Sequence, residues 1–523
     1  MQPVIPPDTT HGTKGSQAEQ PPTKRASDRP SGSFLWVASY GLALTILLCL
    51  TAQRHGPWFD EFWTRFFSDP SVSLSSAFHD RWAQDVHPPL FSFLVWLSAH
   101  IDRLPIEQAR LLNLIPLTSL IIYAGLVCRR LPRERSFIAI LMVALGASSF
   151  LVDAFVEFRS YLTGLCAFTS LLVTLVAQDR LRPEEDGDAS TLLWCGYAIS
   201  LFVCLNIHYL TTAMTVVLVA VFGVAAAIKG DRRRFAIYLT SGIVAAIPFV
   251  AFILYQWGTI ARIWSNYWLK TDLEQASDML AAAIVAPTAG PRSLVAVAWI
   301  LAVALLLRAR PKPRLGGTAL VVFAALLAEV AMLLIYTTLT AALTDRYLAP
   351  LAILSIAVFS IVLSRPIWES RWLLPLFVVS SLYGAVASAL PHRDDPRWDE
   401  AAHYLAMKQK ACPAARIIPM QQDLNDHTPN TVENYNEAYA YMAQKWGLTL
   451  GEVDTPSSRP ASVDCGDYYW ADHFFAAGKS RDTLLAQFLE RWPALRGCTI
   501  IVRQFESQSA VFEVQDPGPA CRR

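Results

Sequence analysis

The chain has 523 residues, of which 53% are hydrophobic and only 17% are charged, and its formal net charge is +1. Its mean hydropathy is +0.33. Soluble domains usually carry about 25% charged residues, so the composition argues against an ordinary soluble protein and favours a polytopic membrane protein. The near-neutral net charge gives no reason to expect a nucleic-acid partner.

The N-terminal segment separates into a polar tail and a first apolar run. Residues 1–33 are rich in Pro, Ser, Thr and Gln, which predicts a disordered cytoplasmic tail. The run 34–52 begins too far into the chain for a typical signal peptide, and Leu50-Thr51-Ala52 is not a clean cleavage site. We therefore interpret this run as a retained membrane helix.

Apolar runs that approach the length of a membrane-spanning helix, about 20 residues, recur as far as residue 390. They are 34–52, 110–128, 136–153, 162–178, 191–207, 210–228, 235–257, 291–309, 317–340, 348–364 and 372–390. The sequence therefore predicts an α-helical membrane domain over 34–390 with about 11 spans, within a range of roughly 9 to 13. The stretch 88–100 is too short to span the bilayer. We interpret it as a helix at the outer interface, within a first outer loop over 53–109.

The charged residues fall into alternate gaps between these runs. The segments 129–135, 229–234 and 308–314 are basic, and the positive-inside rule places them in the cytoplasm. The N-terminus is then cytoplasmic, and the chain from residue 391 lies outside the membrane. The acids, histidines and aromatics that could carry chemistry fall in the other gaps, which are outer.

The segment 391–523 has the pattern of a small extracytoplasmic α/β domain. Helical periodicity covers 398–410 and 482–488, and strand-like runs cover 416–420, 499–505 and 510–515. Four cysteines lie here: Cys412, Cys465, Cys498 and Cys521. In an extracytoplasmic domain they predict one or two disulfides, and their spacing is not that of a zinc site.

Two adjacent carboxylates, Asp60 and Glu61, follow the first span. Such a pair at a membrane surface is costly unless it binds a cation, forms ion pairs or abstracts a proton. A carboxylate within hydrogen-bond reach of an acceptor hydroxyl could activate it for attack on a sugar carbon. We therefore interpret Asp60 and Glu61 as candidate catalytic residues; the alternative is a solvated Asp60 that caps a helix.

Four further outer motifs supply candidate residues for binding a phosphate or a substrate. They are His87, just before two prolines; Glu157, Arg159 and Tyr161; His208 and Tyr209; and Arg346 and Tyr347. Arginine binds phosphate bidentately, so Arg346 and Arg159 are the candidates to meet the charge that develops on a lipid-phosphate leaving group. The plainer alternatives are a helix-start turn at His87, a simple ion pair between Glu157 and Arg159, and a structural His208.

Taken in order, these motifs resemble the family 39-type glycosyltransferases of the GT-C class, which include protein O-mannosyltransferases and the bacterial aminoarabinose transferase that modifies lipid A. The resemblance covers roughly residues 34–410. Its elements are Asp60-Glu61, His87-Pro88-Pro89-Leu90, Arg110, Glu157-x-Arg159-x-Tyr161, His208-Tyr209, Arg346-Tyr347-Leu348-x-Pro350 and Arg397-Trp398-Asp399-Glu400-Ala401-Ala402.

The resemblance implies a GT-C-like bundle in the bacterial inner membrane. It also implies a polyprenyl-phosphate-linked sugar donor, inverting transfer on the periplasmic side, and Asp60 as the base or acceptor-orienting group. The acceptor is left open among a lipid, a glycan and a protein. Some members bind a divalent metal cation near the first outer loop, and here Glu61, Glu157 or His208 are the candidate ligands.

Two other classes of function remain open from the sequence. A transporter or lipid flippase should carry ionisable residues midway along its spans and a repeat between its halves. Glu329 is such a residue, but no repeat is evident. A non-catalytic receptor that uses the outer tail would not need the Asp60 loop.

Overall fold

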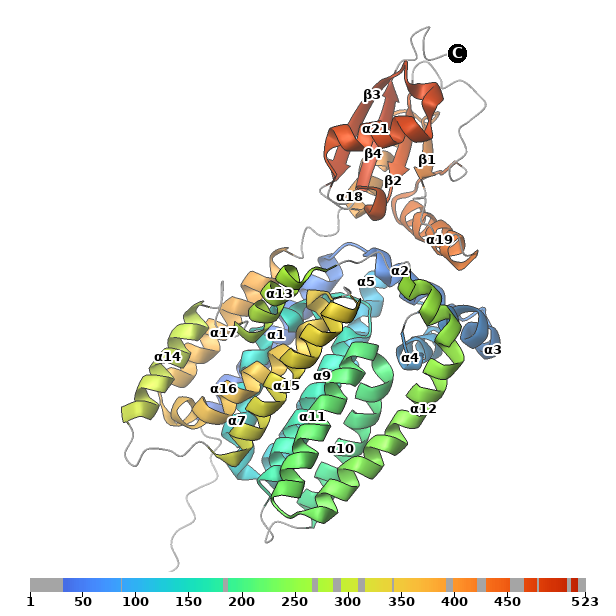
Figure 1. The fold of residues 1–523 in the computed structure, drawn as a ribbon. Coiled ribbons are helices and arrows are strands. Elements are labelled where there is room, and N and C mark those ends of the chain that lie inside the picture. Colours follow the sequence, from blue (N-terminus) through green and yellow to red (C-terminus); the bar gives the residue numbers. More distant parts are fainter. Residues whose placement is uncertain are drawn as a thin grey trace, which may run out of the picture.

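The computed structural model describes residues 32–523, except for 86, 182–186, 266–270, 286–292, 309–315, 341–342, 392–397, 421–428, 452–464, 477–478, 506–508 and 516–523. The predicted disordered tail therefore lies outside the described residues, apart from its last two positions. Figure 1 shows a bundle of long helices with a small sheet domain at one end.

Eight helical segments within the described part of the chain are long and apolar enough to cross a membrane. They correspond to α1 (Gly32–Arg54), α6 (Leu114–Arg130) with the short α5 (Ile106–Ala109) before it, α9 (Tyr161–Asp179), α10 (Asp188–Ile207), α11 (Tyr209–Ile228), α12 (Arg232–Ser265), α15 (Gly317–Thr340) and α16 (Ala349–Glu369). The chain is a multi-pass membrane protein, as the composition predicts.

The other three predicted spans are also helical, but each differs from a full straight helix. The run 136–153 is broken into α7 (Arg135–Gly146) and α8 (Ser149–Val156), which meet at a bend of 63°. The break occurs because Ser148 takes an extended backbone and its side chain accepts a hydrogen bond from the Phe150 N–H. The remaining two, α14 (Ser293–Arg308) and α17 (Leu373–Ala389), have 16 and 17 residues.

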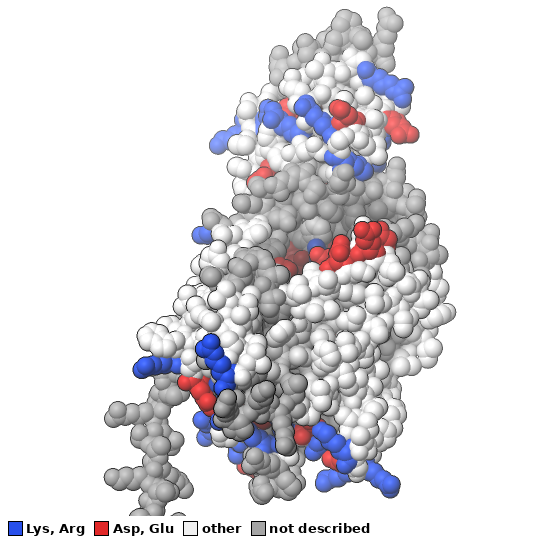
Figure 2. Space-filling view, turned by 60° about the vertical axis from the view of Figure 1, so that its left-hand side comes forward, with Lys and Arg blue, Asp and Glu red and all other residues white. Residues whose placement is uncertain are grey.

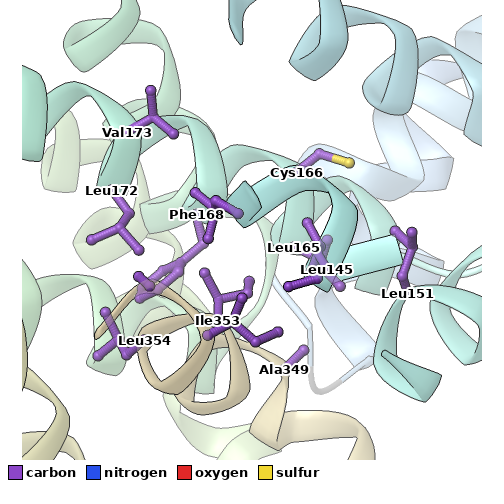
Figure 3. Packing of buried hydrophobic residues seen from close by; sticks show 14 of the residues in the cluster. Leu145, Leu151, Leu165, Cys166, Phe168, Leu172, Val173, Ala349, Ile353 and Leu354 are labelled. Carbon is purple, nitrogen blue, oxygen red and sulfur yellow. The ribbon is translucent and has the colours of Figure 1, made fainter. Parts of the chain in front are cut away.

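The core of the bundle forms around α9, which contacts α6, α8, α10 and α16. Apolar residues cover α9 on every side, which is typical of a helix at the centre of a bundle. Figure 3 shows Leu165, Phe168 and Leu172 of this helix packed with Leu145 and Ile353. This rigid centre supports the polar residues at the outer end of the helices.

Charges divide the bundle along its long axis. On the face drawn in Figure 2, the charged side chains are mostly basic at the end away from the sheet domain and mostly acidic at the end beneath it, with an almost uncharged belt between them. The basic segments 129–135 and 229–234 join α6 to α7 and α11 to α12 at the first of these ends (Figure 1). Most of the third basic segment, 308–314, lies outside the described residues. The assignment of this end to the cytoplasm remains a prediction.

The C-terminal domain is a four-stranded sheet with helices on it, in the strand order β1-β2-β4-β3. The β1–β2 pair is parallel and the other two pairs are antiparallel. Its elements are α18 (Trp398–Ala411), β1 (Arg416–Met420), α19 (Pro429–Trp446), β2 (Asp467–Ala471), α20 (His473–Ala476), α21 (Arg481–Arg491), β3 (Thr499–Phe505) and β4 (Ser509–Gln515). The sequence predicted α18, β1, α21, β3 and β4, but not α19, β2 or the short α20.

Cysteines divide between the two domains as expected. Cys412 at the end of α18 and Cys465 before β2 form a disulfide, and Cys498 is also disulfide-bonded. Cys521 lies outside the described residues. The five cysteines of the helical domain are free: Cys49, Cys128, Cys166, Cys195 and Cys204.

The first outer loop folds into short helices, chiefly α2 (Phe59–Phe67) and α4 (Leu90–Ala99). A fully buried ion pair joins this loop to the bundle: Arg110 Nε and Nη2 lie 2.8 and 2.5 Å from the Glu61 carboxylate oxygens. Arg110 also donates to the backbone carbonyls of Ala52 in the last turn of α1 and of His55 and Gly56 just after it.

We predict that breaking this pair destabilises the protein strongly. Glu61→Gln leaves the buried Arg110 charge without its counter-ion, and such a change costs about 3–5 kcal/mol. Thermal unfolding of the purified protein in detergent measures the effect. Glu369→Gln is the matched control, because its pair with Arg365 is exposed and is worth about 0–1 kcal/mol. Equal midpoints for the two variants would contradict the prediction.

Candidate active site

The site lies at the end of the bundle beneath the sheet domain, where α2 begins (Figure 1). Glu61 sits in the first turn of α2, and its carboxylate accepts a hydrogen bond from the Trp58 N–H at 2.8 Å, which supplies a partner that a helix start otherwise lacks. The same carboxylate accepts from the Phe158 N–H at 2.6 Å. Glu61 therefore brings the start of α2 against the turn between α8 and α9.

This turn carries the second set of candidate residues. Asn113 holds its backbone, since its amide donates to the carbonyls of Phe155 and Glu157 at 2.9 and 2.8 Å. Arg159 reaches back to α2, where its Nη1 donates to the Asp60 carbonyl at 3.1 Å and lies 3.3 Å from the Thr64 hydroxyl.

Two carboxylates and one arginine meet in the middle of the site. Arg346, in the short helix before α16, places Nη1 3.5 Å from Asp60 Oδ2 and 3.5 Å from Glu157 Oε2. Its guanidinium also lies over the ring of Trp58, 4.9 Å from the centroid. The structure thus brings together Asp60, Glu157 and Arg346, which lie far apart in the sequence.

Arg159 retains unused hydrogen-bonding capacity. Its side chain is buried, yet within the described part of the chain no hydrogen-bond acceptor is found for its Nε. Buried polar groups nearly always have hydrogen-bond partners. A buried N–H donor without an acceptor, such as Arg159 Nε, is therefore typical of a ligand-binding site. A small hollow lies beside this side chain, and its lining includes Thr64 and His87.

Histidine and tyrosine rings form the other wall of the site. The His208 ring lies 5.3 Å from that of His87, 5.9 Å from that of Tyr161 and 4.8 Å from that of Tyr347, measured between centroids. His208 Nδ1 accepts from the Leu210 N–H. Burial, followed by the charges of His87 and Arg159, holds the pKa of His208 well below its usual value. The ring is therefore neutral, with its proton on Nε2 available to a ligand.

Glu157 has an unusual protonation balance. Burial raises the pKa of its carboxyl to about 7, although the nearby Arg346 charge opposes this shift. Near neutral pH the residue is divided between its ionised and neutral forms. The strength of the Glu157–Arg346 ion pair therefore depends on pH.

Two residues predicted as site residues have other surroundings. Both oxygens of Glu61 are engaged with Arg110 and with backbone N–H groups, so we now assign it a structural role rather than a catalytic one. The Tyr209 hydroxyl donates to Gln256, which in turn donates to the carbonyl of Asp85, two residues before His87. Tyr209 thus supports the His87 loop from behind.

The predicted metal ligands do not fit a cation site. Glu61 has no free oxygen, Glu157 faces Arg346, and Nδ1 of His208 accepts a backbone hydrogen bond. Among the residues that the structure describes, no group of three or more His, Cys, Asp or Glu side chains is placed to hold a metal ion. We therefore derive no chemical step through a metal.

Sequence reasoning missed Trp58 and Thr64. Thr64 lies four residues after Asp60, so the periodicity of a helix starting near Phe59 would have placed both on one face. Trp58 carried no such signal, because a stacking partner 288 positions away is set only by the tertiary structure.

No protein-family model and no curated protein sequence matches this chain. Comparison with solved structures gives ArnT from Cupriavidus metallidurans bound to undecaprenyl phosphate, with a TM-score of 0.53, 13% identity, and coverage of 91% of this chain and 98% of that one. The apo state of the same protein gives a TM-score of 0.54 and 12% identity, and covers 92% and 98%. This chain therefore has the ArnT fold along nearly its whole described length, in agreement with the GT-C-like bundle that the sequence motifs imply.

Proposed function

We propose that this protein is a glycosyltransferase of a bacterial inner membrane that transfers a sugar, with inversion, from a polyprenyl-phosphate-linked donor to an extracytoplasmic acceptor. The N-terminus is cytoplasmic, and the C-terminal domain is periplasmic. The acceptor is a lipid, a glycan or a protein, and the lipid carrier contacts the membrane-facing part of the bundle. The fold likeness supports this proposal, since the similar ArnT structure holds undecaprenyl phosphate.

The observation that carries the proposal is the placement of two arginines beside Asp60, one at its carboxylate and one at its backbone carbonyl. Arg346 lies 3.5 Å from the Asp60 carboxylate, and Arg159 binds the Asp60 carbonyl at 3.1 Å with its own Nε unused. A site with a base next to fixed cations fits the transfer of a group whose leaving group is a phosphate.

The reaction follows from these positions. Asp60 accepts the proton of the acceptor hydroxyl as its oxygen attacks the anomeric carbon. The bond from that carbon to the phosphate oxygen breaks with its electron pair, leaving polyprenyl phosphate. Arg346 and Arg159 stabilise the negative charge that grows on the phosphate, and the neutral His208 donates from Nε2.

The transport alternative depends on Glu329 alone. This residue is fully buried in α15, and its two oxygens have no hydrogen-bond partner among the side chains and backbone that the structure describes. The clustering of charge at the outer end of the bundle favours transfer chemistry instead.

We expect Asp60→Asn to abolish transfer while leaving carrier binding intact. Loss of a general base lowers the rate by about 10²- to 10⁴-fold. The measurement is the initial rate with a panel of polyprenyl-phosphate sugars, together with binding of undecaprenyl phosphate. Asp102→Asn, an exposed acid of the same outer loop, is the control. Full activity of Asp60→Asn would remove Asp60 from the role of base.

Replacing either arginine should weaken phosphate binding. A hydrogen bond to a charged group is worth about 1.5–3 kcal/mol, so Arg346→Gln and Arg159→Gln should each raise the Kd for undecaprenyl phosphate by roughly 10- to 100-fold. Arg365→Gln, whose side chain is largely exposed, should leave the Kd unchanged. Unchanged affinity in both site variants would place the phosphate elsewhere.

Carrier binding should also weaken as the pH rises through about 7. Below this pH Glu157 is neutral, because its pKa is raised to about 7, and Arg346 is free to bind the phosphate. Above it the ionised carboxylate competes for Arg346 and repels the anion. Titrating the Kd of a phosphodiester-linked donor between pH 6 and 8.5 measures this effect. Glu157→Gln should remove the pH dependence, and an unaltered profile in that variant would contradict the assignment.

A further inference from the structure

The nine-residue helix α2 lies between the site and the C-terminal domain. Asp60 and Thr64, one turn apart, face Arg346 and Arg159, whereas Phe59 and Phe62 belong to an apolar cluster with the C-terminal domain. A helix this short has little stability of its own in water. Its position is therefore set by what packs on its two faces.

Aromatic rings of α18 and α19 cover the outer face of α2. The Phe59 ring lies 5.0 Å from that of Tyr435 and 6.1 Å from that of Trp398. The Phe62 ring lies 5.7 Å from that of Trp398 and 5.6 Å from that of Tyr441. These contacts involve the residues directly beside Asp60 and Glu61.

An ionic contact fixes the register of α19 on α2. Glu437 of α19 lies 3.1 Å from Arg65 Nε in the last turn of α2, and 2.6 Å from Arg103 Nη2 in the loop before α5. Arg65 also donates to the Leu104 carbonyl at 3.1 Å. One carboxylate of the C-terminal domain thus joins the far end of α2 to the segment that leads into Arg110.

We propose that the C-terminal domain is a working part of the catalytic centre, and that Glu437 is a positioning residue that sets the place of Asp60 through Arg65 and α2. The proposal rests on the function proposed above. Without the Glu437 charge, Arg65 and Arg103 repel each other, and the end of α2 loses its ionic contact with α19. Asp60 then shifts relative to Arg346, while the phosphate-binding arginines stay on the bundle.

The test compares Glu437→Gln with Glu433→Gln in the full-length protein. Glu433 lies one turn earlier on α19, is exposed, and reaches Arg81 only at 3.6 Å, so it is a matched control with the same change of charge. We expect Glu437→Gln to lower kcat about tenfold, with the KM for the donor within twofold of wild type, since a shift of about 1 Å at a catalytic group is enough to cost up to 10²-fold in rate. Glu437→Asp should recover much of the loss.

A second readout is independent of activity. Hydrogen exchange over residues 59–67 should be faster in Glu437→Gln than in Glu433→Gln, while exchange over α9 stays the same in both. If wild type transfers no sugar, the proposed function fails, and the exchange comparison alone decides the positioning role. Equal kcat and equal exchange in the two variants would overturn the inference. A fall in kcat with unchanged exchange over 59–67 would also overturn it.

Discussion

The buried ion pair between Arg110 and Glu61 is the interaction on which the outer end of this bundle depends. The Arg110 guanidinium donates to backbone carbonyls at the end of α1 and just after it, and the Glu61 carboxylate accepts from the N–H groups of Trp58 and Phe158. Three segments that are distant in the sequence thus meet at one dry, polar centre. Asp60 lies directly before Glu61 and Arg159 directly after Phe158, and both of these neighbours are held by that centre. The positions of Asp60 and Arg159 are therefore fixed as well. Two buried charges without such partners would be prohibitively costly.

In the site itself, one arginine, Arg346, interacts with two carboxylates instead of forming an ion pair with only one. Arg346 is divided between Asp60 and Glu157 at equal distances of 3.5 Å, so neither carboxylate holds it fully. Glu157 is easily neutralised near physiological pH, because burial has moved its pKa to about 7. An incoming anion thus meets an arginine that exchanges partners at low cost, whereas a fully bidentate pair such as that of Arg110 would resist exchange.

The sequence predicted the helical bundle, the α/β domain and the convergence of Asp60, Glu157 and Arg346, because apolar run length and charge alternation report directly on a membrane environment. It did not predict that Glu61 is sequestered. Local sequence cannot show that Arg110 arrives 49 positions later to take both oxygens. It also missed α19, although the apolar residues Tyr435, Ala438, Tyr439 and Met442 recur there at helical spacing. The bend at Ser148 was likewise hidden inside a continuous apolar run.

The disulfide between Cys412 and Cys465 has a consequence for biogenesis. On the proposed topology, the partners of α2 lie in the exported domain that this disulfide closes, and its cysteines oxidise only after export. A newly inserted bundle would therefore hold Arg159 and Arg346 in place before α18 and α19 cover α2 and position Asp60. Such a chain would start sugar transfer only after its exported domain has folded onto α2.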